Sequence, residues 1–145
     1  MGFINIHGID ASSGMLKESE KKRVYTELDE LFLGSPDTYP AKYHSKYDFT
    51  TASGILADNH LDNSVFEEML LSLKQGGIAV FTSRTEYLES YGYGAYMQML
   101  EETGKWQFVK KEVYIKYDKL AEETEGKQVG RFQPCEVTCF AYKKL

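Results

Sequence analysis

A carboxylate and a small-residue turn are the parts of this sequence best suited to hold a ligand. Asp10 ends an apolar run and is followed by Ala11 and Ser12. An acidic residue directly after a strand can bind the two hydroxyls of a ribose, because one carboxylate accepts two hydrogen bonds. The alternative for Asp10 is a simple helix cap. The turn Ser53-Gly54 would let the backbone approach a ligand closely, because glycine has no side chain.

Three further sites could contact a substrate. His60 follows a predicted strand end and could act as a general base or bind substrate, or could be a loop histidine bonded to backbone. Arg84 follows an apolar run and could clamp a carboxylate or phosphate, or simply be solvated. A tyrosine cluster could wall a substrate pocket, although aromatic residues in an amphipathic segment more often join a core; its members are Tyr87, Tyr91, Tyr93 and Tyr96.

The sequence contains no nucleophile motif, phosphate-binding loop or constellation of metal ligands. Its two cysteines, Cys135 and Cys139, would share one face of a strand. At 3.3 Å per residue they would lie about 13 Å apart, whereas a disulfide needs Cα atoms within about 7 Å. With no second Cys/His pair at ligand spacing, a zinc site is disfavoured. We therefore predict reduced thiols, no metal and a cytoplasmic protein.

Charge and hydropathy exclude several classes of partner. The 145 residues carry 17 Lys and Arg against 22 Asp and Glu, a net charge of −5. Binding to nucleic-acid phosphates or to an anionic membrane usually needs a basic face, so neither is predicted. No apolar run approaches the ~20 residues of a membrane span, and no signal peptide is visible.

The elements that would position these residues alternate between strands and helices. No linker or repeat divides the chain, so we expect one domain over residues 1–145. Turn chemistry is strong at Gly34–Asp37, and Ser53-Gly54 is expected to end a strand. A polar excursion is expected at Lys119–Gln133. The patterns predict strands at Phe3–Ile9, Lys46–Ala52, Ile78–Thr82, Trp106–Tyr117 and Glu136–Lys143, a short apolar run at Glu30–Leu33, and helices at Met15–Arg23, Val65–Leu73 and Ala95–Glu102.

This order predicts an α/β fold with a mostly parallel sheet and an antiparallel pair of strands at the C-terminal end. The run Ile78–Thr82 is apolar throughout, as in a strand covered on both faces. Ligands of such sheets bind beyond the carboxyl ends of the strands, where Asp10, Gly34–Asp37 and Ser53-Gly54 fall.

Several segments resemble, in the right order, those of class I S-adenosylmethionine-dependent methyltransferases. Gly8–Leu16 is similar to their second-strand motif, often G-x-D-x-S-x-x-M-L. Lys46–Leu56 looks like their fourth strand, and Leu70–Thr82 like the following helix and fifth strand, with Gln75 at the usual proline. A narrower likeness to small methyltransferase-like proteins of the Williams–Beuren-region type rests on Ser53–Leu56 with His60, Phe81–Arg84 and Gly104–Trp106.

The resemblance implies a Rossmann-like fold and S-adenosylmethionine as cofactor. Asp10 would bind its ribose, and Ser35 would lie near adenine, although an acidic residue is common at that position. The resemblance also implies cofactor contacts at Ala11, Ser12 and Met15 on the adenosine side and at Ala52, Ser53 and Gly54 beside the methionine, with His60, Arg84 and Tyr87 facing the substrate. The methyl acceptor would be a small molecule or a protein side chain.

The family's first strand and its glycine-rich loop have no counterpart here, because Met1 directly precedes the second-strand segment. In that fold the first strand lies between the second and the fourth, so its loss would expose two strand edges. We expect an incomplete domain that closes its sheet directly or pairs with another chain or a second copy. Two hypotheses follow: a truncated or degenerate methyltransferase, or a non-catalytic methyltransferase-like subunit.

Overall fold

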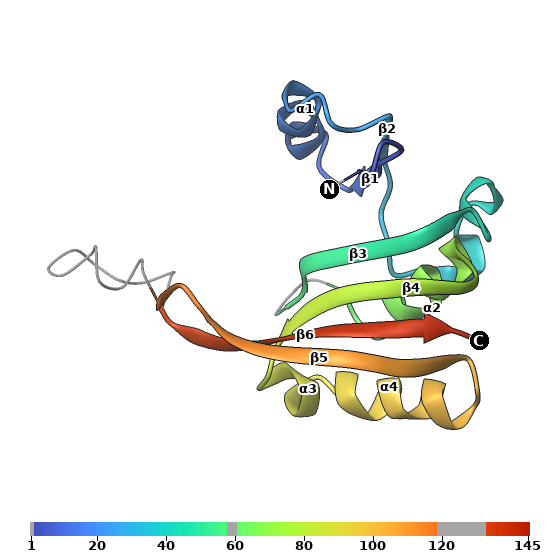
Figure 1. The fold of residues 1–145 in the computed structure, drawn as a ribbon. Coiled ribbons are helices and arrows are strands. Elements are labelled where there is room, and N and C mark those ends of the chain that lie inside the picture. The colour runs from blue at the N-terminus through green and yellow to red at the C-terminus, as the bar shows by residue number, and fades with distance from the viewer. Residues whose placement is uncertain (1, 58–60, 119–132) are drawn as a thin grey trace, which may run out of the picture.

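The computed structural model describes residues 2–57, 61–118 and 133–145. Within these ranges strands and helices alternate, and the strands form two separate sheets (Figure 1). The elements are β1 (His7–Asp10), α1 (Ser13–Lys21), β2 (Glu27–Glu30), two short 3-10 turns (Pro36–Thr38 and Ala41–Tyr43), β3 (Tyr47–Leu56), α2 (Val65–Ser72), β4 (Leu73–Arg84), α3 (Tyr87–Ser90), α4 (Tyr93–Glu102), β5 (Trp106–Lys116) and β6 (Cys135–Lys144).

The larger sheet has the strand order β3-β4-β6-β5. Strand β3 is parallel to β4, whereas β6 is antiparallel to both of its neighbours. Helices α3 and α4 run alongside β5 and β6 (Figure 1). Between helices and sheet lies an aromatic core in which Phe66 of α2 contacts Phe81 of β4 and Trp106 of β5. The buried indole N–H of Trp106 donates to the carbonyl oxygen of Met97 over 3.0 Å. Burial of these large rings contributes strongly to the hydrophobic free energy of this unit.

The smaller sheet pairs β1 in parallel with β2, with α1 as the crossover between them. Gly8 allows the close approach of these elements, since a Cβ there would lie 2.7 Å from Leu28 Cδ2. The N-cap of α1 is Ser12, whose Oγ accepts from the backbone N–H of Met15. In Figure 1 this unit lies beyond the β3 edge of the larger sheet.

Side chains connect the two sheets. His7, the first residue of β1, forms a hydrogen bond of 2.9 Å with the hydroxyl of Tyr47, the first residue of β3. The buried Tyr43 donates its hydroxyl to Asp29 of β2 over 2.6 Å. The tyrosine hydrogen bond, followed by that of Lys42, lowers the pKa of Asp29. Among the described residues, no backbone ladder joins β1 to β3.

The predicted alternation of strands and helices is confirmed, and so is the antiparallel pair β5–β6. Two of the four described pairings are parallel and two antiparallel, so the larger sheet is mixed. The expected strand from Phe3 is shorter, because β1 pairs only where β2 lies opposite. Cys135 and Cys139 are free thiols, as predicted. The predicted polar excursion at 119–133 lies outside the described residues, apart from Gln133.

Two glycine-containing segments, Gly76-Gly77, whose glycines are typical of a helix end, and Ser53-Gly54, predicted to end a strand, lie instead within strands. Helix α2 ends at Ser72 and leads directly into β4, so Gly76 and Gly77 lie within the strand, at a shift of its register with β3. Strand β3 likewise continues through Ser53-Gly54 to Leu56, with an irregular register after Ala52. A glycine with positive φ can be absorbed by an irregular strand as well as by a turn. None of the described helices is long and apolar enough to cross a membrane.

Candidate functional site

Asp10 is the last residue of β1, and its carboxylate is only partly used by the protein. Its Oδ1 accepts a hydrogen bond of 2.8 Å from the backbone N–H of Ser12, while Ser12 itself caps the helix. Asp10 thus shapes the turn before α1 and is not the cap. Among the described residues, no hydrogen-bond donor lies on Asp10 Oδ2, which leaves that oxygen free to accept from a ligand hydroxyl.

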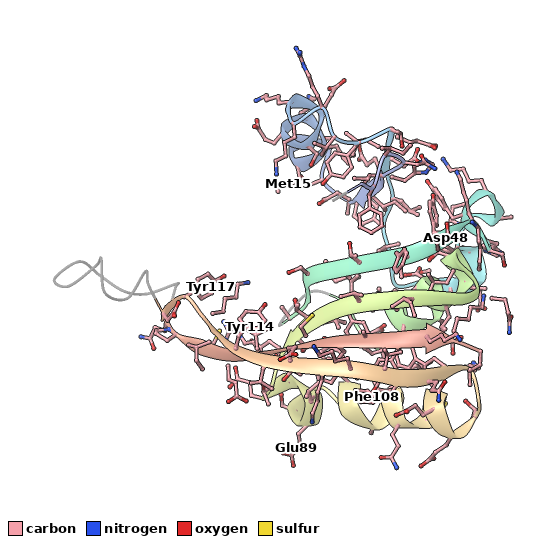
Figure 2. The ribbon with its side chains drawn as sticks, in the orientation of Figure 1. Met15, Asp48, Glu89, Phe108, Tyr114 and Tyr117 are labelled. Atoms are coloured by element: carbon pink, nitrogen blue, oxygen red, sulfur yellow. The ribbon has the colours of Figure 1, made fainter. Side chains whose placement is uncertain are left out.

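The residues after Asp10 are open to solvent. Ala11 and Ser12 are exposed, and Met15 at the start of α1 leaves 56% of its surface accessible (Figure 2). A large exposed thioether can pack against a flat apolar ligand without displacing core side chains. This segment therefore offers one free carboxylate oxygen and an adaptable apolar side chain within six residues.

The turn after β2 is held by a residue that the sequence reasoning missed. Both oxygens of Glu68 in α2 accept backbone hydrogen bonds, one from Gly34 over 2.8 Å and one from Ser35 over 2.9 Å. Gly34 has a φ of +104°, a conformation that favours glycine. Glu68 lies in the apolar stripe of its helix, three residues after Val65. An acidic residue on an apolar helical face could have indicated from the sequence that Glu68 has a specific hydrogen-bonding role.

The segment Ala52-Ser53-Gly54 lies in the second half of β3. The Thr82 hydroxyl of β4 donates to Ser53 Oγ over 3.2 Å, which fixes the serine against the neighbouring strand. Gly54 has a φ of +78°, and a Cβ there would meet no atom of the described residues within 4 Å. Among the described residues, the backbone at Gly54 is therefore open to close approach.

Arg84, the last residue of β4, lies close to Tyr87, the first residue of α3. The guanidinium lies 5.4 Å from the centre of the Tyr87 ring, and it also pairs with Glu86 at 3.2 Å. The hydrogen bond to Glu86 raises the pKa of Arg84, which keeps it charged. Tyr91 packs edge-to-face on Tyr87 with ring centres 4.8 Å apart. The result is a cation beside two aromatic rings, suited to a flat or anionic group.

The other two tyrosines of the predicted cluster belong to the core. The buried Tyr93 donates its hydroxyl to the carbonyl of Leu61 over 2.8 Å, and Tyr96 donates to Glu67 over 3.0 Å. Burial raises the pKa of both phenols. His60, the third predicted substrate contact, lies outside the described residues.

Most of the predicted site residues fall into two groups on different sheets, while Ser35 lies in the turn after β2, outside both sheets. Asp10, Ala11, Ser12 and Met15 belong to the smaller sheet and its helix, while Ala52, Ser53, Gly54, Arg84 and Tyr87 belong to the larger. Within the described ranges no hydrogen bond joins the two groups. A hollow of about 400 Å³ between α1 and β2 is lined by Leu16, Lys17, Glu20, Tyr25, Thr26, Glu27 and Leu28, none of them predicted site residues. The described part of the chain holds no group of three His, Cys, Asp or Glu side chains that could bind a metal.

Comparison of sequences finds a likeness to a human methyltransferase-like protein. The chain is 29% identical over 111 residues to human methyltransferase-like protein 27, an alignment that covers 73% of this chain. It spans 43% of that relative's length, so less than half of the human protein is represented. No family model matches the chain.

Comparison of structures gives likenesses over nearly the whole chain at low sequence identity. The N-methyltransferase NodS of Bradyrhizobium japonicum in complex with S-adenosylhomocysteine gives a TM-score of 0.61 at 14% identity, covering 97% of this chain and 66% of that one. A SAM-dependent methyltransferase of Methanosarcina mazei gives 0.59 at 11%, covering 97% and 82%. The [4+2]-cyclase SpnF gives 0.60 at 14%, covering 97% and 67%.

These likenesses agree with the order of motifs in the sequence. The cyclase shares the fold although its name states a different reaction, which shows that the fold by itself does not set the chemistry. The resemblance seen in the sequence is confirmed, and the chain has the Rossmann-like fold of the class I S-adenosylmethionine-dependent methyltransferases.

Proposed function

We propose that this chain provides most of an S-adenosylmethionine-dependent methyltransferase domain over residues 1–145. The observation that carries the proposal is the carboxylate of Asp10, which ends β1 with one oxygen unpartnered among the described residues. In a fold of this class, that oxygen is available to accept a ribose hydroxyl. The human relative's name and the methyltransferases of similar fold support the same activity.

The proposed roles follow the two groups of residues. Asp10 binds the ribose, and the Gly34–Ser35 turn lies beside adenine. We propose that Ala11, Ser12 and Met15 line the adenosine side, that Ala52, Ser53 and Gly54 border the methionine, and that His60, Arg84 and Tyr87 face the acceptor. The cofactor supplies an already activated methyl group, so these residues bind and align rather than activate. The cation and rings of Arg84 and Tyr87 fit a flat or anionic acceptor, either a small molecule or a protein side chain.

The open edges of β1 and β3 support a second element of the proposal. Each of these strands has one paired neighbour among the described residues, β2 and β4 respectively. We propose that a further strand, from another chain or a second copy, pairs between them, and that it makes the completed sheet mostly parallel. If such pairing were the chain's whole purpose, the protein would be a non-catalytic pseudoenzyme subunit. Its two free thiols support a cytoplasmic location.

Calorimetric titration with S-adenosylhomocysteine tests the cofactor proposal. We expect micromolar binding by the wild-type chain and a loss of at least about tenfold in Asp10→Asn, since a hydrogen bond to a charged group is removed. Glu30→Gln is the matched control, because Glu30 is the register partner of Asp10 at the end of β2 and is exposed. Normal binding by Asp10→Asn would refute the ribose site.

Absence of binding by the folded wild-type chain would instead favour the non-catalytic subunit. Light scattering then separates the two readings further. A subunit that pairs through β1 and β3 is expected to form a dimer or a complex. A monodisperse monomer without cofactor binding would contradict both the pairing and the enzyme.

A further inference from the structure

Glu68 is a buried carboxylate whose described hydrogen-bond partners are backbone groups. Its surface is 2% exposed, and its two oxygens accept from the N–H groups of Gly34 and Ser35 at 2.8 and 2.9 Å. The adjacent residue Glu67, by contrast, forms an ion pair with Lys105, whose Nζ lies 2.9 Å from Glu67 Oε1. Burying an acid without a cation is costly, and two charge-assisted hydrogen bonds offset that cost.

The two N–H groups belong to the turn that follows β2. Gly34 is held in a left-handed conformation, with Leu61 Cδ2 and Ser64 Oγ about 3.6 and 3.7 Å from the position of a Cβ. The Ser35 carbonyl accepts from the N–H of Thr38 over 3.0 Å and thereby starts the 3-10 turn Pro36–Thr38. The Ser35 residue itself is exposed. Glu68 therefore binds the backbone N–H groups of the turn, while the Ser35 residue stays exposed to solvent.

We propose that Glu68 is a positioning residue, which fixes the Gly34–Ser35 turn from helix α2 so that this turn can contact the adenine end of the cofactor. The inference rests on the proposed function for the identity of the ligand, but the two hydrogen bonds between Glu68 and the turn are a property of the free protein. Helix α2 begins nine residues after the end of β3. Through Glu68, this helix fixes the conformation of the backbone that follows β2.

The hydrogen bonds from Gly34 and Ser35 to Glu68 can be observed through the two amide protons in a nitrogen–proton NMR spectrum. We expect both to exchange slowly and to resonate downfield in the wild-type chain, because their acceptor is charged. In Glu68→Gln one acceptor becomes an NH₂ donor facing an N–H, so at least one of the two resonances should move upfield. Glu67→Gln, the same change one residue earlier, should leave both in place.

The affinity for S-adenosylhomocysteine, measured on the same variants, reports the positioning role. We expect about tenfold weaker binding by Glu68→Gln and less than about a twofold change in Glu67→Gln. Glu68→Asp keeps the charge on a shorter side chain, and should restore part of the affinity. A general loss of stability would not produce this order among variants of matched melting temperature.

The outcomes separate the inference from the proposed function. Unchanged amide resonances in Glu68→Gln, or moved resonances with unchanged affinity, would overturn the inference. If neither the wild-type chain nor any variant binds S-adenosylhomocysteine while the amide resonances respond as expected, the proposed function fails. The hydrogen bonds from Gly34 and Ser35 to Glu68 would then be confirmed, but without a role in cofactor binding. If Glu68→Gln does not fold, fast exchange of both amides in the wild-type chain would overturn the inference by itself.

Discussion

The ring of Tyr47 meets that of His7 edge to face, with ring centres 5.3 Å apart and the tyrosine hydroxyl 2.9 Å from His7 Nδ1. This pair joins the first residue of β3 to the first residue of β1, and hence the larger sheet to the smaller. The same imidazole nitrogen lies 3.2 Å from Glu27 Oε2 of β2. A single half-buried contact thus gathers the starts of three strands.

Loss of this contact should weaken the docking of the smaller sheet. We predict that Tyr47→Phe lowers the free energy of unfolding by about 0.5–1.5 kcal/mol, the usual net value of one hydrogen bond. Urea denaturation measures this change. Tyr114→Phe is the control, because Tyr114 in the second half of β5 is 44% exposed and has no hydroxyl partner among the described residues (Figure 2). Equal stability of the two variants would contradict the prediction.

Asp29 should make the protein sensitive to acid. Its pKa in the folded chain is lowered, first by the hydrogen bond from Tyr43 and then by that from Lys42, below the ordinary value of 3.8. A depressed pKa contributes stability that is present above about pH 4 and is lost as the pH falls through the folded-state value. In Tyr43→Phe the titration midpoint of the Asp29 carboxyl, followed by carbon NMR, should move up toward 3.8. A midpoint that stays in place would show that the tyrosine is not the main cause.

Phe66 should be one of the costliest core positions. Its side chain is fully buried, and its ring lies within 5.1–6.2 Å, centre to centre, of Phe81, Tyr93, Tyr96 and Trp106. We predict that Phe66→Ala reduces the free energy of unfolding by about 3–5 kcal/mol, through lost transfer energy and a cavity. Trp106 fluorescence follows the transition. Phe32→Ala, at a residue 75% exposed, should cost less than about 0.5 kcal/mol.

Two glycines on either side of Asp10 should respond in opposite ways to alanine. Gly8→Ala places a methyl group 2.7 Å from Leu28 Cδ2 and 3.1 Å from Tyr25, so we predict a loss of about 1–3 kcal/mol by overpacking. Gly14 lies in α1, and the nearest atom to an added Cβ is Ser12 Oγ at 3.6 Å. Gly14→Ala should therefore stabilise the protein by about 0.5 kcal/mol. Thermal unfolding of both variants checks the contrast, which a similar shift in both would disprove.

The local elements were predictable where the pattern was strong. Val65, Phe66, Met69 and Leu70 fall at helical spacing and all lie on the buried face of α2. The strand end at Asp10 was also correct, and so were the turn at Gly34 and the free thiols. These features depend on neighbours within a few residues, which is the range over which sequence periodicity carries information.

Other features depend on partners far along the chain and could not be read locally. The role of Glu68 needs a turn 33 residues earlier, and the extension of β4 back to Leu73 needs Tyr47 of β3 opposite it. The choice for Asp10 is different, because it is local: the sequence left open whether Asp10 caps the helix or binds a ligand, and Ser12, two residues later, provides the cap. On the proposed acceptor side, the guanidinium of Arg84 lies over the ring of Tyr87. The spacing of the two residues in the sequence does not by itself predict this contact.

Strand β6 lies between β4 and β5, although it follows both of them in the sequence. It brings Phe140 and Tyr142 into the core, and Lys144 Nζ donates to the carbonyls of Leu70 and Leu73 at 2.7 and 2.9 Å. A ribosome releases residues 135–144 after everything that they join. Until then the facing edges of β4 and β5 stay unpaired, and the end of α2 lacks its ammonium partner. The larger sheet can therefore close only once residues 135–144 have been synthesised, and until then β4 and β5 each expose an edge that could pair with another chain.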